Sequence, residues 1–197
     1  MEGIPLPNRI GLNFQCMTEK HAELLLTWRT DPNITKHMYT DIDDPCVNKQ
    51  INWIQEKNKQ EDYRGYVIYD DERPVGFLSF NDISLLHQRC STGSYLYCKK
   101  ARLKYAATLH TYICNYAFHR LNCNKIVNYI MGANDKVVRL NKLHGTHLIG
   151  TLRQHIFKNG KFHDVKIFEQ LRNEWHSQKQ HFPLQVIQQA YQDWAEE

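Results

Sequence analysis

The chain has 197 residues, a formal net charge of +4 and a hydrophobic content of 42%. This length supports one domain with a full hydrophobic core and does not require a second domain. The modest positive charge suits a small anionic ligand but is too weak to indicate nucleic-acid binding. No apolar run is long enough to span a bilayer, and residues 1–9 lack the apolar centre of a signal peptide.

Six cysteines are scattered along the chain without the CxxC spacing of a zinc or redox motif. This pattern favours reduced thiols over a disulfide framework. His144 and His147 flank Gly145-Thr146, but no Cys or carboxylate joins them at ligand spacing. We therefore expect a cytoplasmic protein without a metal site.

The first half of the chain predicts an edge strand, two helices and two strands joined by a turn, over residues 11–17, 18–29, 47–60, 62–70 and 75–80. Thr18 is a suitable N-cap for the first helix, and Asp31-Pro32 ends it. The turn between the two strands is expected at residues 71–74.

Residues 93–145 carry the strongest pattern, which predicts a strand, a basic loop, a helix, a strand and a helix, over 94–98, 99–104, 105–121, 125–131 and 134–144. A strand that ends in a basic loop opening a helix is an anion-binding geometry, because free backbone N–H groups and the positive end of the helix dipole meet there. We expect a phosphorylated cofactor at this loop.

The dipeptide Asn159-Gly160 predicts a two-residue hairpin turn. Counting back from the turn gives the pairs Lys158–Lys161, Phe157–Phe162, Ile156–His163 and His155–Asp164. The last pair is either structural or near a reacting amine, because a histidine can titrate near neutrality. Further on, a helix starting at Pro183 has an apolar stripe that must pack against the domain or a second copy.

Three stretches together resemble one family. They are LLLTWRTDP at residues 24–32 followed by Met38-Tyr39, the central strand–loop–helix–strand–helix pattern, and LRQHIFKNGKFHDV at residues 152–165. The chain resembles the GCN5-related N-acyltransferases (GNATs), in particular the branch of ribosomal-protein acetyltransferases and of the pseudaminic-acid-pathway acetyltransferase that acts on a UDP-linked 4-amino sugar. The resemblance covers roughly residues 11–175.

The fold that this resemblance implies is an α/β (α+β) GNAT fold: a mixed, mostly antiparallel twisted sheet with helices on both faces and an extra C-terminal helix. Residues 1–175 would form the acyltransferase domain, and residues 176–197 a linker and an amphipathic helix that could form a homodimer. The two central strands should splay near Tyr97 and Tyr129, where the family seats the acyl-pantetheine arm.

The implied activity is acyl transfer, most readily acetyl transfer, from acetyl-CoA to a small amine without a metal. A nucleotide-linked amino sugar is the first acceptor that the resemblance implies, and a protein N-terminus is the alternative. No nucleic-acid or membrane partner is expected.

The resemblance also implies site residues. Those expected to contact the cofactor are Tyr97, Arg102, Leu103, Lys104, Tyr105, Ala106, Ala107 and Asn134. Those expected around the acceptor are Trp28, Arg29, Met38, Tyr39, Asn81, Asp82, His155 and Asp164. A core position for Trp28, an ion pair for Arg29 and a turn position for Asp82 remain alternatives.

The chain departs from the family pattern at four positions, one of which is Ala101 in place of the first basic residue of the pyrophosphate loop. Lys104 replaces the middle glycine of the pyrophosphate loop, Tyr129 a strand glutamate and Asn141 a helix tyrosine. Acyl transfer to an amine needs a route for the amine proton and a donor for the thiolate. Either Tyr129 or His144 moves protons through water, with Asn141 also at the site, or acetyl transfer is lost and the domain binds a nucleotide, a sugar or a partner.

Overall fold

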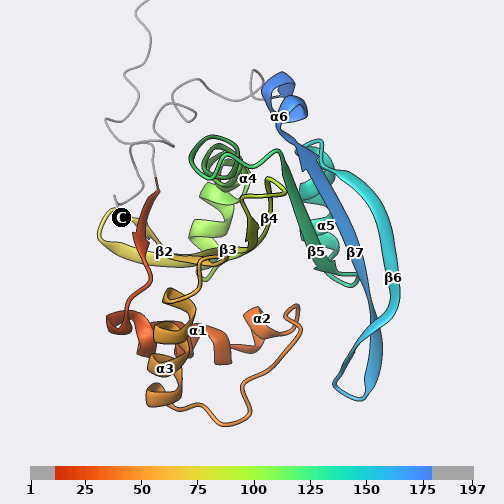
Figure 1. The fold of residues 1–197 in the computed structure, drawn as a ribbon. Coiled ribbons are helices and arrows are strands. Elements are labelled where there is room, and N and C mark those ends of the chain that lie inside the picture. The colour runs from red at the N-terminus through yellow and green to blue at the C-terminus, as the bar shows by residue number, and fades with distance from the viewer. Residues whose placement is uncertain (1–11, 179–197) are drawn as a thin grey trace, which may run out of the picture.

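A twisted seven-stranded sheet organises the computed structural model, which describes residues 12–178 (Figure 1). The strand order is β1-β2-β3-β4-β5-β7-β6, and only β4 and β5 pair in parallel. The strand bounds are β1 Asn13–Cys16, β2 Arg64–Asp70, β3 Arg73–Ser84, β4 Arg89–Leu96, β5 Lys125–Met131, β6 His147–Lys158 and β7 Lys161–Leu171. The predicted mixed, mostly antiparallel sheet is confirmed.

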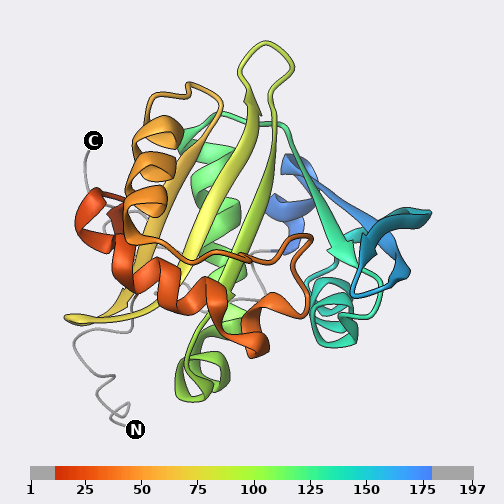
Figure 2. The same ribbon diagram turned by 90° about the horizontal axis from the view of Figure 1, so that it is seen from below.

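Helices cover both faces of this sheet (Figure 2). One face carries the short helix η1 Glu19–His21, then α1 Ala22–Thr30, α2 Pro32–Thr35 and α3 Val47–Asn58. The other carries α4 Lys99–Asn115, its π-helical extension η2 Tyr116–Arg120, and α5 Asp135–Leu143. α6 Arg172–Gln178 follows β7.

The alternation of side chains along β2 explains why both faces are covered. Tyr66 and Ile68 lie in the apolar cluster that includes Leu109 of α4, whereas Val67 lies in the cluster that includes Leu25 of α1. Successive strand residues point to opposite faces, so a continuous apolar run needs cover on both sides.

The parallel strands β4 and β5 diverge soon after they meet. Their pairing is confined to Arg89 with Lys125 and Cys90 with Ile126. Two residues further along each strand, the side-chain Oδ1 of Asn128 accepts hydrogen bonds from the backbone N of Thr92 at 3.1 Å and from its Oγ1 at 2.9 Å. The predicted splay is therefore present. It divides the sheet into an N-terminal arm (β1–β4 with α1–α4) and a C-terminal arm (β5–β7 with α5 and α6).

The predicted basic loop at residues 99–104 is wrong, because these residues form the first turns of α4. Cys98 is the N-cap, and its Sγ accepts a hydrogen bond from the backbone N of Ala101 at 3.3 Å. Lysine, arginine, alanine and leucine all favour helix, and the stretch holds no glycine or proline to stop one. The basic residues are thus presented from a helix.

The hairpin at Asn159-Gly160 is confirmed, with Lys158 opposite Lys161. The predicted pairing of His155 with Asp164 is wrong, because the register shifts between Leu152 and Ile156. Gln154 adopts a φ of 52°, and its backbone N donates instead to Asp164 Oδ1 at 2.8 Å. This is a β-bulge, which a count from the turn cannot detect.

The C-terminal part of the prediction is only partly covered by the described residues. α6 crosses the predicted boundary at residue 176 and continues to Gln178. The helix predicted from Pro183, and the dimer contact assigned to it, lie outside the described residues. Within residues 12–178, no helix combines the length and the apolar character needed to cross a membrane.

Candidate active site

The basic residues at the start of α4 lie beside the divergence of the two arms. Arg102 Nη1 donates to the carbonyls of Leu96 at 2.8 Å and Tyr97 at 2.5 Å, so its side chain holds the end of β4. Lys99 and Lys100 are exposed in the first turn. The helix dipole and these two ammonium groups together favour an anion at this point.

Lys104 points instead to the end of β2. Its Nζ lies 3.3 Å from Asp70 Oδ1 and 4.6 Å from the ring centroid of Tyr105. The Tyr105 hydroxyl donates to the same carboxylate oxygen at 2.5 Å. Hydrogen bonding to Tyr105 and then to Asp70 raises the pKa of Lys104. Lys104 therefore stays charged, but its charge is engaged by a neighbouring strand.

The remaining cofactor candidates on α4 differ in exposure. Tyr105 is buried in the core, Ala106 is half-buried, and Leu103 is 81% exposed. Ala107 is exposed, and its carbonyl oxygen is 3.0 Å from His144 Nε2. Asn134 caps α5 with its backbone carbonyl, which accepts from Val138 N at 3.0 Å.

The end of β4 rests on the end of α1. Tyr97 stacks on Trp28, with ring centroids 5.4 Å apart and planes at 21°. Tyr95 meets the same indole edge-on at 6.1 Å. Trp28 is buried and so occupies the core position that the sequence left as an alternative. Stacked rings fix the direction in which β4 leaves the sheet.

The loop between α2 and α3, residues 36–46, extends from the N-terminal arm towards the C-terminal arm (Figure 2). Arg29 Nη2 donates to Thr40 O at 3.4 Å, a backbone contact instead of the ion pair considered above. Tyr39 is 37% exposed, and burial, followed by the charge of Tyr129, raises its pKa. Tyr129 is 50% exposed on β5. The two phenols thus approach each other from opposite arms.

His37 lies in the same loop, and its Nδ1 is buried without a hydrogen-bond partner. Burial is the main cause that lowers its pKa, followed by Lys36. The opposing charge of Asp135, at the start of α5, also acts on this imidazole. The loop therefore lies close to the first turn of α5.

Lys158 also contacts this loop, although no sequence pattern pointed to it. It is the last residue of β6, yet its side chain is only 5% exposed. Its Nζ donates to Thr35 O at 2.7 Å, to Met38 O at 2.9 Å and to Asp41 Oδ1 at 2.7 Å. A lysine beside an Asn-Gly turn is normally a solvated residue, and no pattern in the sequence marks this one as buried.

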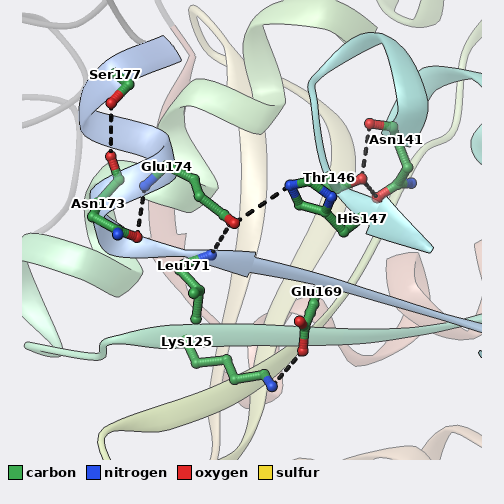
Figure 3. Close-up of polar contacts among 9 residues, drawn as sticks. All are labelled: Lys125, Asn141, Thr146, His147, Glu169, Leu171, Asn173, Glu174 and Ser177. Carbon is green, nitrogen blue, oxygen red and sulfur yellow. Dashed lines mark hydrogen bonds and ion pairs between the residues drawn. The ribbon is translucent and has the colours of Figure 1, made fainter. Parts of the chain in front are cut away.

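The two remaining catalytic candidates are engaged in local contacts. Asn141 Nδ2 donates to Val137 O at 2.9 Å, and its Oδ1 accepts from Thr146 Oγ1 at 3.2 Å (Figure 3). His144 is buried and stacks on His110, with ring centroids 4.2 Å apart and planes at 8°. Burial lowers the pKa of His144, and it lowers that of His110 to about 3.

Four acceptor candidates lie away from the loop. Asn81 is opposite Ser91, and Asp82 Oδ2 accepts from Ser91 Oγ at 3.0 Å, close to the start of β4. From Ser91 to Leu96 the strand covers roughly 16 Å, at about 3.3 Å per residue. His155 and Asp164 are exposed around the β6 bulge. The contacts join Tyr97 to Trp28 and join Arg29 to the loop that contains Met38 and Tyr39, whereas Asn81 and Asp82 lie at the other end of β4.

The arrangement can hold an extended ligand that carries an anion. Strands that separate leave the backbone groups of their facing edges available for a ligand with amide groups, as in strand addition. The positive end of α4 lies beside one of those edges. Among residues 12–178, no cluster of three or more His, Cys, Asp or Glu side chains could hold a metal ion.

Comparison with known proteins identifies the class that this fold and site define. A family model described as "Acetyltransferase (GNAT) domain" matches residues 12–146. The chain belongs to this family of acetyltransferases, in agreement with the sequence resemblance.

One curated relative and two solved structures also resemble this chain. "Acetyltransferase PseH" of Campylobacter jejuni is 24% identical over 128 residues, covering 65% of this chain and 78% of the relative. The structure of spermidine N-acetyltransferase from Vibrio cholerae in complex with CoA and spermine superposes with a TM-score of 0.77 at 19% identity, covering 84% of this chain and 98% of that one. A dodecameric structure of spermidine N-acetyltransferase from the same organism gives a TM-score of 0.70 at 19% identity, covering 83% and 95%.

Proposed function

We propose that this acetyltransferase moves an acetyl group from acetyl-CoA to the amine of a nucleotide-linked amino sugar. The observation that carries the proposal is the divergence of β4 and β5 beside the basic first turn of α4. The resemblance in sequence favours an amino sugar, whereas the spermidine N-acetyltransferases that share the fold raise the alternative of a polyamine. The cytoplasmic location expected from the scattered cysteines is part of the proposal.

The residues present suit the co-substrate. Lys99, Lys100 and the positive end of α4 would hold the pyrophosphate, and the edges of β4 at Tyr97 and β5 at Tyr129 would hold the pantetheine amides. Bound acetyl-CoA supplies the thioester that is attacked. Arg102 supports this site indirectly, because it fixes the carbonyl groups at the end of β4.

The pairing of two of the three carboxylates in the 36–46 loop supports a sugar over a polyamine, the third being the exposed Asp43. A polyamine carries several positive charges and needs carboxylates that are free to bind them. Asp41 is paired with Lys158 at 2.7 Å, and Asp44 with Lys49 at 2.5 Å. Tyr39 and Tyr129 offer exposed aromatic surface, which suits a sugar ring or a base.

Tyr129 remains the side chain best placed to take part in proton transfer. It is half exposed at the divergence, whereas Asn141 and His144 already make the local contacts described above. Its phenol hydroxyl can donate a hydrogen bond to the leaving thiolate. The amine proton would leave to water, and the rate would come mainly from positioning.

Calorimetric titration with acetyl-CoA is the first test, followed by release of free CoA in the presence of a UDP-linked 4-amino sugar or of spermidine. We expect micromolar acetyl-CoA binding and turnover with the sugar. The matched variants are Lys99→Ala with Lys100→Ala, which should weaken binding, and Lys166→Ala on β7 as a control. No binding up to millimolar acetyl-CoA would exclude the proposal. Preferred turnover of spermidine or of a peptide N-terminus would show that the acceptor is that amine and not an amino sugar.

A further inference from the structure

One buried ammonium group joins the two arms of the molecule. Lys158 lies at the tip of the β6–β7 hairpin in the C-terminal arm, and all three of its oxygen partners belong to residues 35–41 of the N-terminal arm. At least 117 residues of sequence separate it from each partner. Figure 1 shows the hairpin reaching past the end of β5 towards the α2–α3 loop.

The chemistry of this contact makes it specific. An ammonium group has three donors, and here each donor has one oxygen acceptor within 2.9 Å. Lysine is almost never this buried unless its charge is paired, and Asp41 supplies the pairing charge. Removing the ammonium would take one donor from Thr35 O, which also accepts from Met38 N at 2.8 Å, and would remove the hydrogen bonds of Lys158 to Met38 O and Asp41. The loop would then lose its fixed position.

The contact lies at the open end of the divergence. β7 pairs with the last residue of β5 at Val165, and the hairpin continues four residues further to Lys161. Asn128 joins the arms at the closed end, through its hydrogen bonds to Thr92. Lys158 and Asn128 thus link the arms at opposite ends of the region where β4 and β5 separate.

We propose that Lys158 is a positioning residue for the amine acceptor. It holds Met38 by its carbonyl and thereby fixes the position of the next residue, Tyr39, in the loop that reaches from the N-terminal arm to the hairpin. The width of the acceptor entrance is set by this contact, whereas the acetyl-CoA site at the start of α4 is not. The inference rests on the proposed acetyl transfer and adds to it the residue that shapes the acceptor side.

The test compares Lys158→Met with Lys161→Met, which changes the exposed lysine directly opposite on the same hairpin. For Lys158→Met we expect the acceptor KM to rise about tenfold or more, while kcat falls less and the Kd of acetyl-CoA stays within about twofold. Lys161→Met should leave all three unchanged. Lys158→Arg keeps the charge and the donors and should recover part of the loss.

Amide hydrogen exchange on the unliganded protein tests the contact separately from turnover. Exchange in residues 36–41 should increase in Lys158→Met and not in Lys161→Met, with Asp41→Asn as a milder variant if Lys158→Met does not fold. Unchanged exchange in both variants would show that Lys158 does not hold the loop in place. Increased exchange with an unchanged acceptor KM would overturn the positioning role. Absence of any acetyl transfer by the wild-type protein would exclude both the proposed function and the positioning role. Hydrogen exchange would still show whether Lys158 holds the loop.

Discussion

The two arms of the molecule are stabilised by different means. The N-terminal arm has an apolar cluster on each face of its strands, one beneath α4 and one beneath α1 and α3. The C-terminal arm has one small cluster of its own, formed by Ile130, Val138 and Phe168, while Ile126 of β5 and Trp175 of α6 join the cluster beneath α4. Its buried side chains also include polar ones, namely His144, Thr146, Lys158 and Gln170.

Because of this difference, the two arms on either side of the divergence of β4 and β5 can have different roles. Apolar packing over both faces makes the N-terminal arm a rigid support for the helix that would hold the pyrophosphate. In the C-terminal arm, strand pairing and a few directional polar contacts determine position. Large-to-small substitutions should therefore affect stability most in the first arm, and polar substitutions should affect site geometry most in the second.

The largest expected effect is a core truncation in the N-terminal arm. Phe80 is fully buried and stacks on Tyr116 with ring centroids 4.7 Å apart. Phe80→Ala should lower the free energy of unfolding by about 3–5 kcal/mol, since it removes apolar contact and leaves a cavity. Phe157→Ala in the C-terminal arm, where the ring is 64% exposed, should cost less than about 1 kcal/mol. Urea denaturation measures both, and equal losses would contradict the comparison.

The next effect concerns the histidines between the arms. Burial lowers the pKa of His110 to about 3 and also lowers that of His144, from an ordinary 6.5. Below pH 6.5 the unfolded chain binds protons at these positions that the folded protein does not bind. The free energy of unfolding should therefore decrease as pH falls from 6.5 towards 3, by up to about 1.4 kcal/mol per pH unit for His110, and His144 contributes in the same direction.

Substitution of His110 provides the control for this prediction. His110→Leu should reduce the pH slope, while His155→Gln, at an exposed position of β6, should leave it unchanged. Burial also lowers the pKa of His21 and His37, which contribute in the same direction and remain in both variants. If the pH dependence of the free energy of unfolding is identical in the His110 variant and the wild-type protein, the burial of His110 does not cause the loss of stability in acid.

An intermediate effect is expected at the closed end of the divergence. Asn128→Ala removes the oxygen that accepts from Thr92 N and Oγ1, leaving two partly buried donors unsatisfied. We expect a loss of about 1–3 kcal/mol in stability and weaker acetyl-CoA binding. Asn128→Asp retains the acceptor oxygen and should lose less. If calorimetry gives the same acetyl-CoA affinity for both variants and the wild type, the contact of Asn128 with Thr92 does not affect the cofactor site.

The smallest effect is expected at Lys104. Its ion pair with Asp70 is partly exposed, so Lys104→Ala should change stability by less than about 1 kcal/mol. Acetyl-CoA affinity should change by less than about twofold, because the ammonium is directed at β2. Lys104→Gly should cost about 1 kcal/mol more than Lys104→Ala, as glycine does inside a helix. A strong loss of affinity in the alanine variant would place Lys104 at the phosphates after all.

Sequence patterns predicted those parts of the molecule that depend on local signals. The strand at 125–131 has the predicted bounds, and the Asn159-Gly160 turn gives the predicted register up to His163. Both depend on side-chain periodicity and turn chemistry within a few residues. The splay of β4 from β5 followed from the family resemblance, since no local pattern encodes it.

Other features depend on contacts that no local pattern contains. The prediction of a basic loop at residues 99–104 was wrong, because these residues favour helix and continue into α4. The bulge at Gln154 interrupts a register that is correct nearer the turn. Lys158 is buried only because a loop more than a hundred residues earlier closes over it. The roles of the individual site residues stay predictions until the variants are measured.

The irregular course of β6 has a consequence for how this protein behaves at high concentration. β6 is an edge of the described sheet, and an edge of 12 residues would ordinarily invite another chain to add a strand. Its register shifts twice, between Leu148 and Gly150 and between Leu152 and Ile156. Only short stretches are therefore regular enough to template a neighbour, while β1 at the other edge has just four residues. The same bulge that separates His155 from Asp164 thus protects the protein from aggregation through its longest open edge.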